Sequence, residues 1–557
     1  MKKNLNRFLG LLMAIMMVLP MFSFAAAEEL TTITIYPKNG DLLSGVLDGY
    51  KGRFFAEHGL RIEVWAYSDD KTNAILASGD LPDIMYLNDT ILPTMIQAEM
   101  LLPLDEHLEK MPNVMARENL VPALNYAREY KSNDTGKLWY MPVNVGVADG
   151  SGDETERYAI RLNWEFYEGI GAPEVTNIWD LIPVVKQMLE AYPEGNPDGS
   201  NKSKNYGTVL NSGSDTTYWG NIQMPFYWSG YQVTELPYML EADMIEGTYT
   251  SILNTESKYY ESLKWYNAMY REGLIDPDSI NLDRPTQKAK VDGGNVMLPT
   301  GTNPGWRPTY YQILLDDTRS YYPDYSTYGA VGIGINAKTD KLDACLKFLD
   351  LIANADNYMP FRQGPEGWKW EFDENGNVVL TDAFIETIKA GTTMGPMADG
   401  EEFMLWNTPW ITHYGEPTTL TDPNGNPIPC NINGWKEYQE ISGTNPTYLK
   451  WKDRVGYATY NEWAASQGKY FNTSPIQDVS SFTSQPDDMT KLVMDALRDV
   501  VVTASWQMVY AETDEAFQAI WDQMVADCEG LGAQDIIDWR LEDLAAAKAK
   551  QDALAGN

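Results

Sequence analysis

Cysteine is scarce in this chain of 557 residues, in which Cys345, Cys430 and Cys528 are the only examples. Three cysteines so far apart in the sequence form at most one disulfide bond, which excludes a disulfide framework as the basis of the fold. Cys345 stands among apolar residues of a predicted helix, and we expect its thiol to be a small core group.

Histidine is as rare, with only His58, His107 and His413. The sequence contains no His-Glu-x-x-His, Cys-x-x-Cys, Gly-x-x-x-x-Gly-Lys or Gly-x-Ser-x-Gly motif. Zinc-dependent hydrolysis, nucleotide hydrolysis and a Ser-His-Asp triad on a nucleophile elbow therefore have no support in the sequence. We expect no catalytic residue and no cofactor.

Positive charge is also in short supply, since 42 Lys and Arg residues stand against 79 Asp and Glu, for a formal net charge of -37 at pH 7. This excess of negative charge disfavours nucleic acid and anionic membrane surfaces as partners. It disfavours anionic ligands only weakly, because a few basic side chains such as Lys38, Arg307 and Arg362 are enough to dominate the charge of one cleft.

Long apolar runs are limited to the N-terminus, where residues 8–24 follow three basic residues and precede three alanines. This pattern predicts a secretory signal over residues 1–27, cut before Glu28. A membrane-spanning helix needs about 20 apolar residues, whereas Gly10 and Pro20 interrupt this run. We therefore expect an exported protein, extracellular or periplasmic. Because no cysteine closely follows the predicted cleavage site, we expect no lipid anchor.

Aromatic side chains are what the chain has in abundance, with 18 Trp and 34 Tyr against 15 Phe. Tyr and Trp combine a flat apolar face with a hydrogen-bonding edge. A sugar ring has the complementary surface, with one apolar C–H face and a rim of hydroxyl groups. We expect most of the aromatics to be buried, and a handful in loops to be enough to line a sugar cleft.

The first third of the chain has the pattern of an α/β unit. Residues 32–36 alternate β-branched side chains and predict a strand, residues 60–65 and 82–86 predict the next two, and helices end at residues 59 and 77 between them. The order is therefore βαβαβ, which is typical of a parallel sheet.

Polar residues follow the first and third of these strands. Asn39 and Asp41 come after the first, and Asn88 and Asp89 come after the third. Ligands bind at the carboxyl ends of the strands in open α/β sheets, so these side chains are candidates for a binding site. Further along, the polar, glycine-containing residues 149–156 predict a crossing between two lobes.

Several phrases of the sequence resemble one protein family. The stretch Ala77-Ser-Gly-Asp-Leu-Pro-Asp-Ile84, followed by Gln97-Ala-Glu-Met-Leu-Leu-Pro-Leu-Asp-Glu106, is similar to a signature of the extracellular solute-binding proteins of ABC importers, family 1, which includes maltose-binding protein. The phrase Arg161-Leu-Asn-Trp164 resembles the same family, as does the strand 331–336. So does the segment 259–278, which predicts a helix stopped by Gly273 and followed by Leu274-Ile-Asp-Pro-Asp278.

The resemblance implies an α/β fold of the periplasmic-binding-protein type II class, with two lobes joined by a hinge of crossing strands. Lobe 1 would comprise residues 28–148 plus 331–392, and lobe 2 residues 149–330 plus 393–557. The implied protein is a monomer that captures a small solute, here an oligosaccharide, and delivers it to the permease subunits of an ABC transporter. Hydrolysis of ATP would belong to other subunits of that importer.

Candidate ligand-binding residues are the polar groups at strand ends and the aromatics with glycine or proline neighbours. Asn88 and Asp89 fall where maltose-binding protein has polar ligand contacts, although the Trp frequent in that loop is replaced by Leu87. The full set is Asn39, Asp41, Tyr86, Asn88, Asp89, Trp219, Trp228, Trp306, Trp368, Trp406 and Trp410. Packing in the core is the competing role for each tryptophan.

One loop resembles a metal site. Residues 196–207 stand where some polysaccharide-binding relatives carry an EF-hand-like calcium loop, but the ninth place is Lys204 and the twelfth is Gly207, where calcium requires a bidentate acid. Asp198 is the single carboxylate, so we expect no metal.

Two other functions stay open from the sequence. A secreted glycoside hydrolase needs two carboxylates held about 5 to 9.5 Å apart, a spacing that a sequence so rich in acids does not reveal. The same binding fold also serves ligands such as peptides and uronides, and the aromatic content favours a neutral oligosaccharide.

Overall fold

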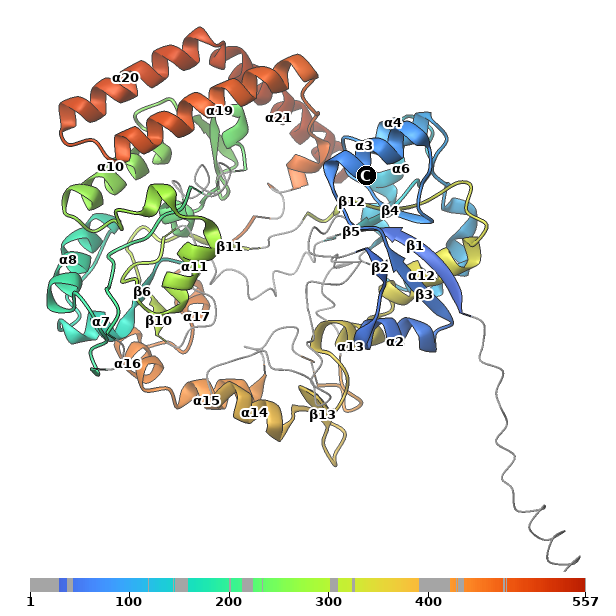
Figure 1. Cartoon of the computed structure of the whole chain (residues 1–557), viewed down its shortest axis with the longest axis horizontal. Coiled ribbons are helices and arrows are strands. Elements are labelled where there is room, and N and C mark those ends of the chain that lie inside the picture. Colours follow the sequence, from blue (N-terminus) through green and yellow to red (C-terminus); the bar gives the residue numbers. More distant parts are fainter. Residues whose placement is uncertain are drawn as a thin grey trace, which may run out of the picture.

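The computed structural model describes residues 30–37, 44–118, 120–143, 145, 159–199, 202–212, 224–232, 234–300, 309–322, 326–389, 421–426, 428, 435–473, 476 and 478–555. These residues form two lobes side by side, each a mixture of helices and strands (Figure 1). The predicted secretory signal, the predicted lobe crossing at 149–156 and Cys430 lie outside the described residues.

Lobe 1 is built on a six-stranded sheet in the order β2-β3-β1-β4-β12-β5. The strands are β1 (Thr31–Tyr36), β2 (Gly45–Val46), β3 (Leu60–Val64), β4 (Ile84–Tyr86), β5 (Met141–Val143) and β12 (Ala330–Ile335). Strand β1 pairs in parallel with both β3 and β4, which confirms the predicted βαβαβ unit. Strand β12 pairs antiparallel with β4 and β5, so a strand from late in the chain completes this sheet.

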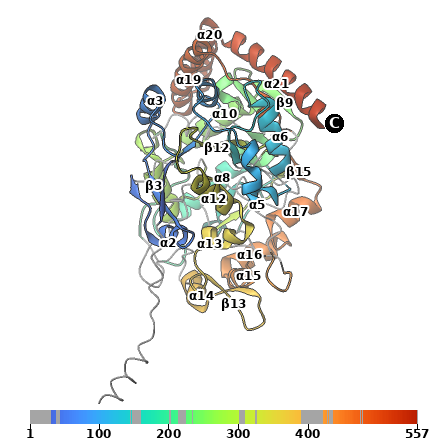
Figure 2. The ribbon, with the colours of Figure 1, turned by 90° about the vertical axis from the view of Figure 1, so that its right-hand side faces the viewer.

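Helices cover the sheet of lobe 1 on both sides. They are α2 (Gly49–Glu57), α3 (Asp69–Ser78), α4 (Leu92–Gln97), α5 (Pro112–Met115), α6 (Leu120–Tyr130) and α12 (Leu342–Ala353), with the 3₁₀ helix η1 (Asp105–Lys110). Figure 2 shows α2 and α3 to one side of β12, and α5 and α6 to the other. Cys345 is fully buried in α12 and unpaired, which confirms the prediction of a core thiol.

The third strand begins at Ile84 and not at the predicted Pro82, and Asp83 stands just before it. Its carboxylate accepts hydrogen bonds from the Thr34 backbone N (2.8 Å) and hydroxyl (2.9 Å), the Thr339 hydroxyl (2.6 Å) and Lys341 Nζ (3.1 Å). Burial alone would raise the pKa of this carboxyl, but these donors outweigh it and hold the pKa below its usual range. Asp83 thus ties β1 and β4 to the chain that leads into α12.

Glycines in β12 allow its neighbours to approach closely. A Cβ at Gly332 would lie 2.3 Å from the Met141 carbonyl oxygen, and one at Gly334 would lie 2.7 Å from the Leu87 side chain. The glycine-alternating sequence Val331-Gly-Ile-Gly-Ile335 is therefore required for β12 to fit between β4 and β5.

Lobe 2 contains the larger core. Its helices are α7 (Trp164–Gly169), α8 (Leu181–Ala191), α10 (Lys258–Arg271), α11 (Arg284–Asp292), α16 (Pro446–Val455), α17 (Tyr460–Ser466), α19 (Asp488–Val509), α20 (Asp514–Gly530) and α21 (Ala533–Ala555). Its strands are β6 (Arg161–Asn163), β7 (Tyr231–Gln232), β8 (Leu240–Asp243), β9 (Thr248–Ser251), β10 (Tyr310–Gln312), β11 (Ser320–Tyr322) and β15 (Tyr470–Asn472). Short 3₁₀ helices are η3 (Ile178–Asp180), η4 (Met224–Ser229), η5 (Leu236–Tyr238), η6 (Ser279–Asn281) and η9 (Asp478–Phe482).

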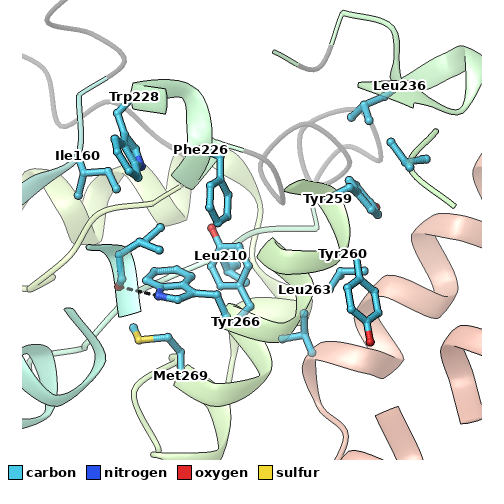
Figure 3. Close-up of a cluster of buried hydrophobic side chains, with 14 of the residues drawn as sticks. Ile160, Leu210, Phe226, Trp228, Leu236, Tyr259, Tyr260, Leu263, Tyr266 and Met269 are labelled. Atoms are coloured by element: carbon cyan, nitrogen blue, oxygen red, sulfur yellow. Dashed lines mark hydrogen bonds between the residues drawn. The ribbon is translucent and has the colours of Figure 1, made fainter. Parts of the chain in front are cut away.

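Helix α10 lies at the centre of this core and supplies Tyr259, Leu263 and Tyr266 to it (Figure 3). The predicted stop of this helix at Gly273 is confirmed, because α10 ends at Arg271 and Gly273 adopts a positive φ of 72°. The side chain of Asn267 donates to the carbonyl oxygens of three residues at the end of α19, which joins the two helices.

A third, smaller hydrophobic cluster lies between the lobes along the chain. Its elements are α13 (Tyr358–Gln363), β13 (Trp370–Phe372), β14 (Val378–Leu380), α14 (Asp382–Lys389) and α15 (Lys436–Gly443), at the lower centre of Figure 1. The cluster contains Trp370, Phe384 and Trp435 and is separate from the cores of both lobes. The exact lobe boundaries, including the limit at residue 392, stay a prediction.

Among the described residues, none of the helices combines the length and the apolar character needed to cross a membrane. Cys528 is buried in α20 and, like Cys345, forms no disulfide bond.

Candidate functional site

A pocket of about 280 Å³ lies where the two lobes meet. Lobe 1 contributes residues at the end of β4 and on and after α6, the segment before β12 contributes a second wall, and the stretch from η9 toward α19 contributes a third. The lining residues are Asp89, Tyr126, Lys131, Ser326, Gly329, Ala330, Val331, Ser480, Ser481, Thr483 and Gln485. We refer to it as the junction pocket.

Asp89 and Lys131 form an ion pair in the junction pocket. Asp89 follows β4, Lys131 follows α6, and Lys131 Nζ lies 2.6 Å from Asp89 Oδ1. The Asp89 side chain is 39% exposed and that of Lys131 is 21% exposed, so both reach solvent through the pocket. Lys131 Nζ also lies 5.8 Å from the centre of the Tyr126 ring. The pair places a hydrogen-bond acceptor and a donor beside an aromatic face.

Asn88 has a local role beside this pair. Its Oδ1 accepts the backbone N–H groups of Thr90 and Ile91, each at 3.0 Å, which shapes the turn before α4. Asn88 therefore holds the loop on which Asp89 is presented, and the junction pocket is lined by Asp89 and not by Asn88.

Four aromatic rings from three segments join the lobes at the pocket. Tyr126 stacks on Tyr130 and Tyr328 with ring centres 5.5 Å and 5.0 Å apart, and Phe482 meets Tyr126, Tyr130 and Tyr328 edge-on at 5.1, 4.9 and 5.1 Å. We call these residues the junction aromatic cluster. The Tyr126 hydroxyl donates to the Ser481 carbonyl oxygen. Burial raises the pKa of Tyr126, so this hydroxyl stays protonated and can donate.

Helix α6 packs against the cores of both lobes through two hydrophobic faces. Leu120, Ala123 and Leu124 pack in the core of lobe 1, whereas Tyr126 belongs to the core cluster of lobe 2. One helix is thus shared between the two cores.

Asp478 fastens the segment before β12 to η9. Its Oδ1 accepts the Ser326 hydroxyl and the Thr327 backbone N–H, each at 2.6 Å, and the Ser326 hydroxyl also lies 2.9 Å from that of Ser481. Burial raises the pKa of the Asp478 carboxyl above its ordinary value, and the two hydrogen bonds oppose that shift. Two walls of the junction pocket are therefore fixed to each other.

Apart from Trp368, the remaining predicted site residues fall into three groups. Tyr86 is partly buried on β4, and burial raises its pKa. Trp228 is only 2% exposed and packs in the core of lobe 2 (Figure 3). A ligand contact at Trp228 stays a prediction. Outside the described residues lie Asn39, Asp41, Trp219, Trp306, Trp406 and Trp410.

Trp368 lies beside the third hydrophobic cluster, at the start of the β13–β14 hairpin. Lys369 Nζ lies 4.6 Å from the centre of its ring, and Thr381 donates to its carbonyl oxygen at 2.7 Å. Burial lowers the pKa of Lys369 to about 8. Trp368 is partly buried in these contacts, and a ligand contact stays a prediction.

Sequence reasoning did not identify most of the junction pocket. Lys131, Tyr126 and the polar stretch 480–485 were missed, because the hydrogen bond between Tyr126 and Ser481 joins residues 355 positions apart. The one available signal was local: Lys131 and Tyr126 stand at the C-terminal end of a helix that follows the predicted β-strands.

The loop over residues 196–207, of which 200 and 201 lie outside the described residues, is anchored near its end by the Asn205 amide. Asn205 Nδ2 donates to the carbonyl oxygens of Tyr192 (3.0 Å) and Gly195 (2.7 Å), and Lys204 Nζ lies 5.1 Å from the centre of the Tyr206 ring. Within the described residues, no three His, Cys, Asp or Glu side chains gather as a metal site would require.

Solved structures resemble this chain over almost its whole length. An HMO-binding, ABC-transporter-associated solute-binding protein from Bifidobacterium longum infantis covers 94% of this chain and 99% of its own, with 16% identity and a TM-score of 0.56. The ABC-transporter substrate-binding protein FusA of S. pneumoniae, an EF-hand mutant in complex with fructo-nystose, covers 95% and 100%, with 15% identity and a TM-score of 0.57.

A third structure, the N-glycan transport solute-binding protein NgtS from Streptococcus pneumoniae, covers 93% of this chain and 99% of its own, with 14% identity and a TM-score of 0.52. No protein-family model and no curated protein sequence matches the chain. At these identities the likeness is one of fold: the chain has the two-lobe α/β fold of the solute-binding proteins of ABC transporters.

Proposed function

We propose that this protein is the secreted substrate-binding component of an ABC importer, which captures an oligosaccharide between its two lobes and delivers it to a membrane permease. The observation that carries the proposal is the junction pocket, which combines one acceptor, one ammonium group, several hydroxyl groups and an aromatic ring at the meeting point of the lobes. A cleft between two lobes suits capture and release by closure.

The chemistry of the pocket suits a sugar. Asp89 would accept hydrogen bonds from ring hydroxyls, Lys131 would donate to them, and the hydroxyls of Ser480 and Ser481 would do either. The Thr483 hydroxyl donates to the Ser480 carbonyl oxygen at 2.7 Å and would accept. Tyr126 also lines the pocket, but its ring is 2% exposed and packed against Tyr130 and Tyr328, so stacking on sugar C–H groups would fall to other aromatic side chains. Asp89 and Lys131 neutralise each other, which favours a neutral ligand over a uronide.

The fold relatives support a carbohydrate ligand. They are described as binding HMO, as being in complex with fructo-nystose, and as N-glycan transport and alginate-binding proteins. Carbohydrates are common to these descriptions, and the permease subunits of an ABC transporter are the partners that a receptor of this kind requires. Export by the signal over residues 1–27, a monomeric state and the absence of catalysis complete the proposal.

A glycoside hydrolase is the alternative that shares the ligand. Hydrolysis requires two carboxylates around the scissile bond, and Asp89 is the single carboxylate among the described residues that line the junction pocket. The neighbouring Asp478 is engaged by Ser326 and Thr327. The pocket therefore favours binding over hydrolysis.

A thermal-shift screen of the purified protein against neutral oligosaccharides, uronides and peptides tests the proposal. A ligand at a hundredfold excess over its dissociation constant stabilises the folded state by about 2.7 kcal/mol, which raises the melting temperature. We expect a rise with neutral oligosaccharides and intact sugar by mass spectrometry in the same wells. Cleaved sugar would establish the hydrolase instead, and a shift with peptides or uronides alone would replace the proposed ligand.

A further inference from the structure

The polar wall of the junction pocket is held from outside the pocket. Residues 480–485 comprise the end of η9 and the chain that leads toward α19, and they present Ser480, Ser481, Thr483 and Gln485 to the cavity. The backbone N–H of Ser484, between two of these lining residues, donates to both carboxylate oxygens of Asp543 at 3.0 Å each. Asp543 belongs to α21, close to the C-terminal end of the chain.

Asp543 is itself fixed by a buried charge network. Arg540 Nη1 lies 2.9 Å from Asp543 Oδ2, and the same guanidinium makes two hydrogen bonds to Glu235, from Nε to Oε2 at 2.6 Å and from Nη2 to Oε1 at 3.0 Å. The side chains of Arg540, Asp543 and Glu235 are 5%, 9% and 7% exposed. The Arg540 guanidinium also lies 4.2 Å from the centre of the Tyr238 ring.

These contacts therefore hold the Asp543 side chain in one rotamer before any ligand binds. A bidentate pair between Arg and a carboxylate fixes geometry as well as charge, and Glu235 stands just before η5 in the body of lobe 2. Leu544 and Ala547 of α21 pack in the same core as Val479 and Phe482 of η9, so the helix cannot shift without moving that segment. In Figure 1, α21 runs from the top of lobe 2 toward the junction.

We propose that Asp543 is a positioning residue for the junction pocket: anchored by Arg540 and Glu235, it holds residues 480–485 in the shape that presents their side chains to the ligand. Asp543 touches no ligand and acts through the backbone of Ser484. This inference rests on the proposed function, because it assigns to α21 a part in solute affinity.

The test uses the substitution Asp543→Ala, with Glu542→Ala as the matched control. Glu542 is the adjacent, exposed acid on the same helix, so its removal changes the charge equally without touching Ser484. Asp543→Asn is the second variant, since it keeps one acceptor oxygen and the shape of the side chain and protects the test against misfolding of the alanine variant.

Two readouts separate positioning from general stability. Hydrogen exchange of the peptide spanning residues 480–486 reports the wall directly, and we expect it to accelerate at least tenfold in Asp543→Ala while peptides of α21 keep their protection. Affinity for the oligosaccharide that gives the largest thermal shift with the unaltered protein should fall about tenfold by titration calorimetry, in variants that remain folded at the assay temperature.

Unchanged exchange of residues 480–486 in both variants would overturn the anchoring. Faster exchange with unaltered affinity would overturn the part in binding. If no solute of the panel binds the unaltered protein, the proposed function fails and the assignment of α21 to solute affinity fails with it, whereas the exchange readout still decides whether Asp543 orders the wall.

Discussion

Single side chains carry out much of the long-range organisation, and Asp83 is the clearest example. The phrase that contains it, Gly79-Asp-Leu-Pro-Asp83, pointed to a binding protein through resemblance, yet the carboxylate faces Thr34, Thr339 and Lys341 inside lobe 1. Asp83, which belongs to the phrase that resembles the family, stabilises the fold of lobe 1. The residue that lines the pocket, Asp89, stands six positions later.

The substitution Asp83→Asn should lower the free energy of unfolding by about 1 to 3 kcal/mol at pH 7, because a charged acceptor of several buried donors is lost. The folded-state pKa is lowered, so the contribution of the carboxylate is present above the unfolded-state value of about 3.9 and is lost as the pH falls through the folded-state value. Urea unfolding at pH 7 and again near the acid limit measures both effects.

The control is Asp80→Asn, which alters an exposed acid three positions away. A penalty for Asp83→Asn that stays constant into acid, or one no larger than that of the control, would contradict the assignment.

Asp89→Ala should weaken solute binding about tenfold or more while changing stability little. Its ion pair with Lys131 is partly exposed, and such pairs contribute about 0 to 1 kcal/mol to folding. Titration calorimetry with the solute found by the screen, alongside urea unfolding, measures the two quantities. Lys131→Gln should weaken binding as well, and affinity retained by both variants would remove this pair from the site.

At the scale of elements, the glycines of β12 are the sharpest constraint. Gly332→Ala places a Cβ against the Met141 carbonyl oxygen, at a separation of 2.3 Å in the unaltered backbone. Overpacking of this kind costs about 1 to 3 kcal/mol, so we expect a lower melting temperature. Gly530→Ala is the control, because nothing lies within 4 Å of the added Cβ at the end of α20. Equal melting temperatures for the two variants would contradict the packing of β12.

Elements made of local signals were predictable. The strands β1, β3 and β4 follow alternating apolar residues, and their parallel order follows from the helices between them. The end of α10 was predictable as well, because Gly273 marks the stop and its left-handed backbone conformation ends the helix. The pairing of β12 with β5 joins distant residues and has no local signal.

For the whole molecule, the junction aromatic cluster governs how the lobes sit together. Phe482→Ala should lower the free energy of unfolding by about 3 to 5 kcal/mol, since the ring is 4% exposed and contacts Tyr126, Tyr130 and Tyr328. Loss of these contacts should also loosen the lobes and raise the radius of gyration, measured by small-angle X-ray scattering.

Phe372→Ala provides the matched control, because that ring is 42% exposed on β13. An unchanged radius of gyration in a folded Phe482→Ala variant would show that the cluster stabilises the protein without setting the arrangement of the lobes.

The two-lobe architecture was within reach of sequence reasoning, and the pocket was not. Local patterns predicted the strands β1, β3 and β4, and the family resemblance implied the two lobes, whereas the pocket depends on where residues 480–485 meet α6, a matter of tertiary packing. Trp228 illustrates the same limit, since its glycine neighbour suggested a loop and its ring lies in the core.

The position of β12 in the sequence also determines when the sheet of lobe 1 can be completed during synthesis. At about 5 to 20 residues per second, ribosomal synthesis brings out β12 on the order of 10 to 40 s after β5, because the strands are separated by most of lobe 2. Until β12 has been synthesised, no strand joins β4 to β5, and the six-stranded sheet of lobe 1 stays incomplete. The core of lobe 1 therefore depends on a strand that is synthesised long after the residues it joins, and its completion waits for one glycine-rich segment.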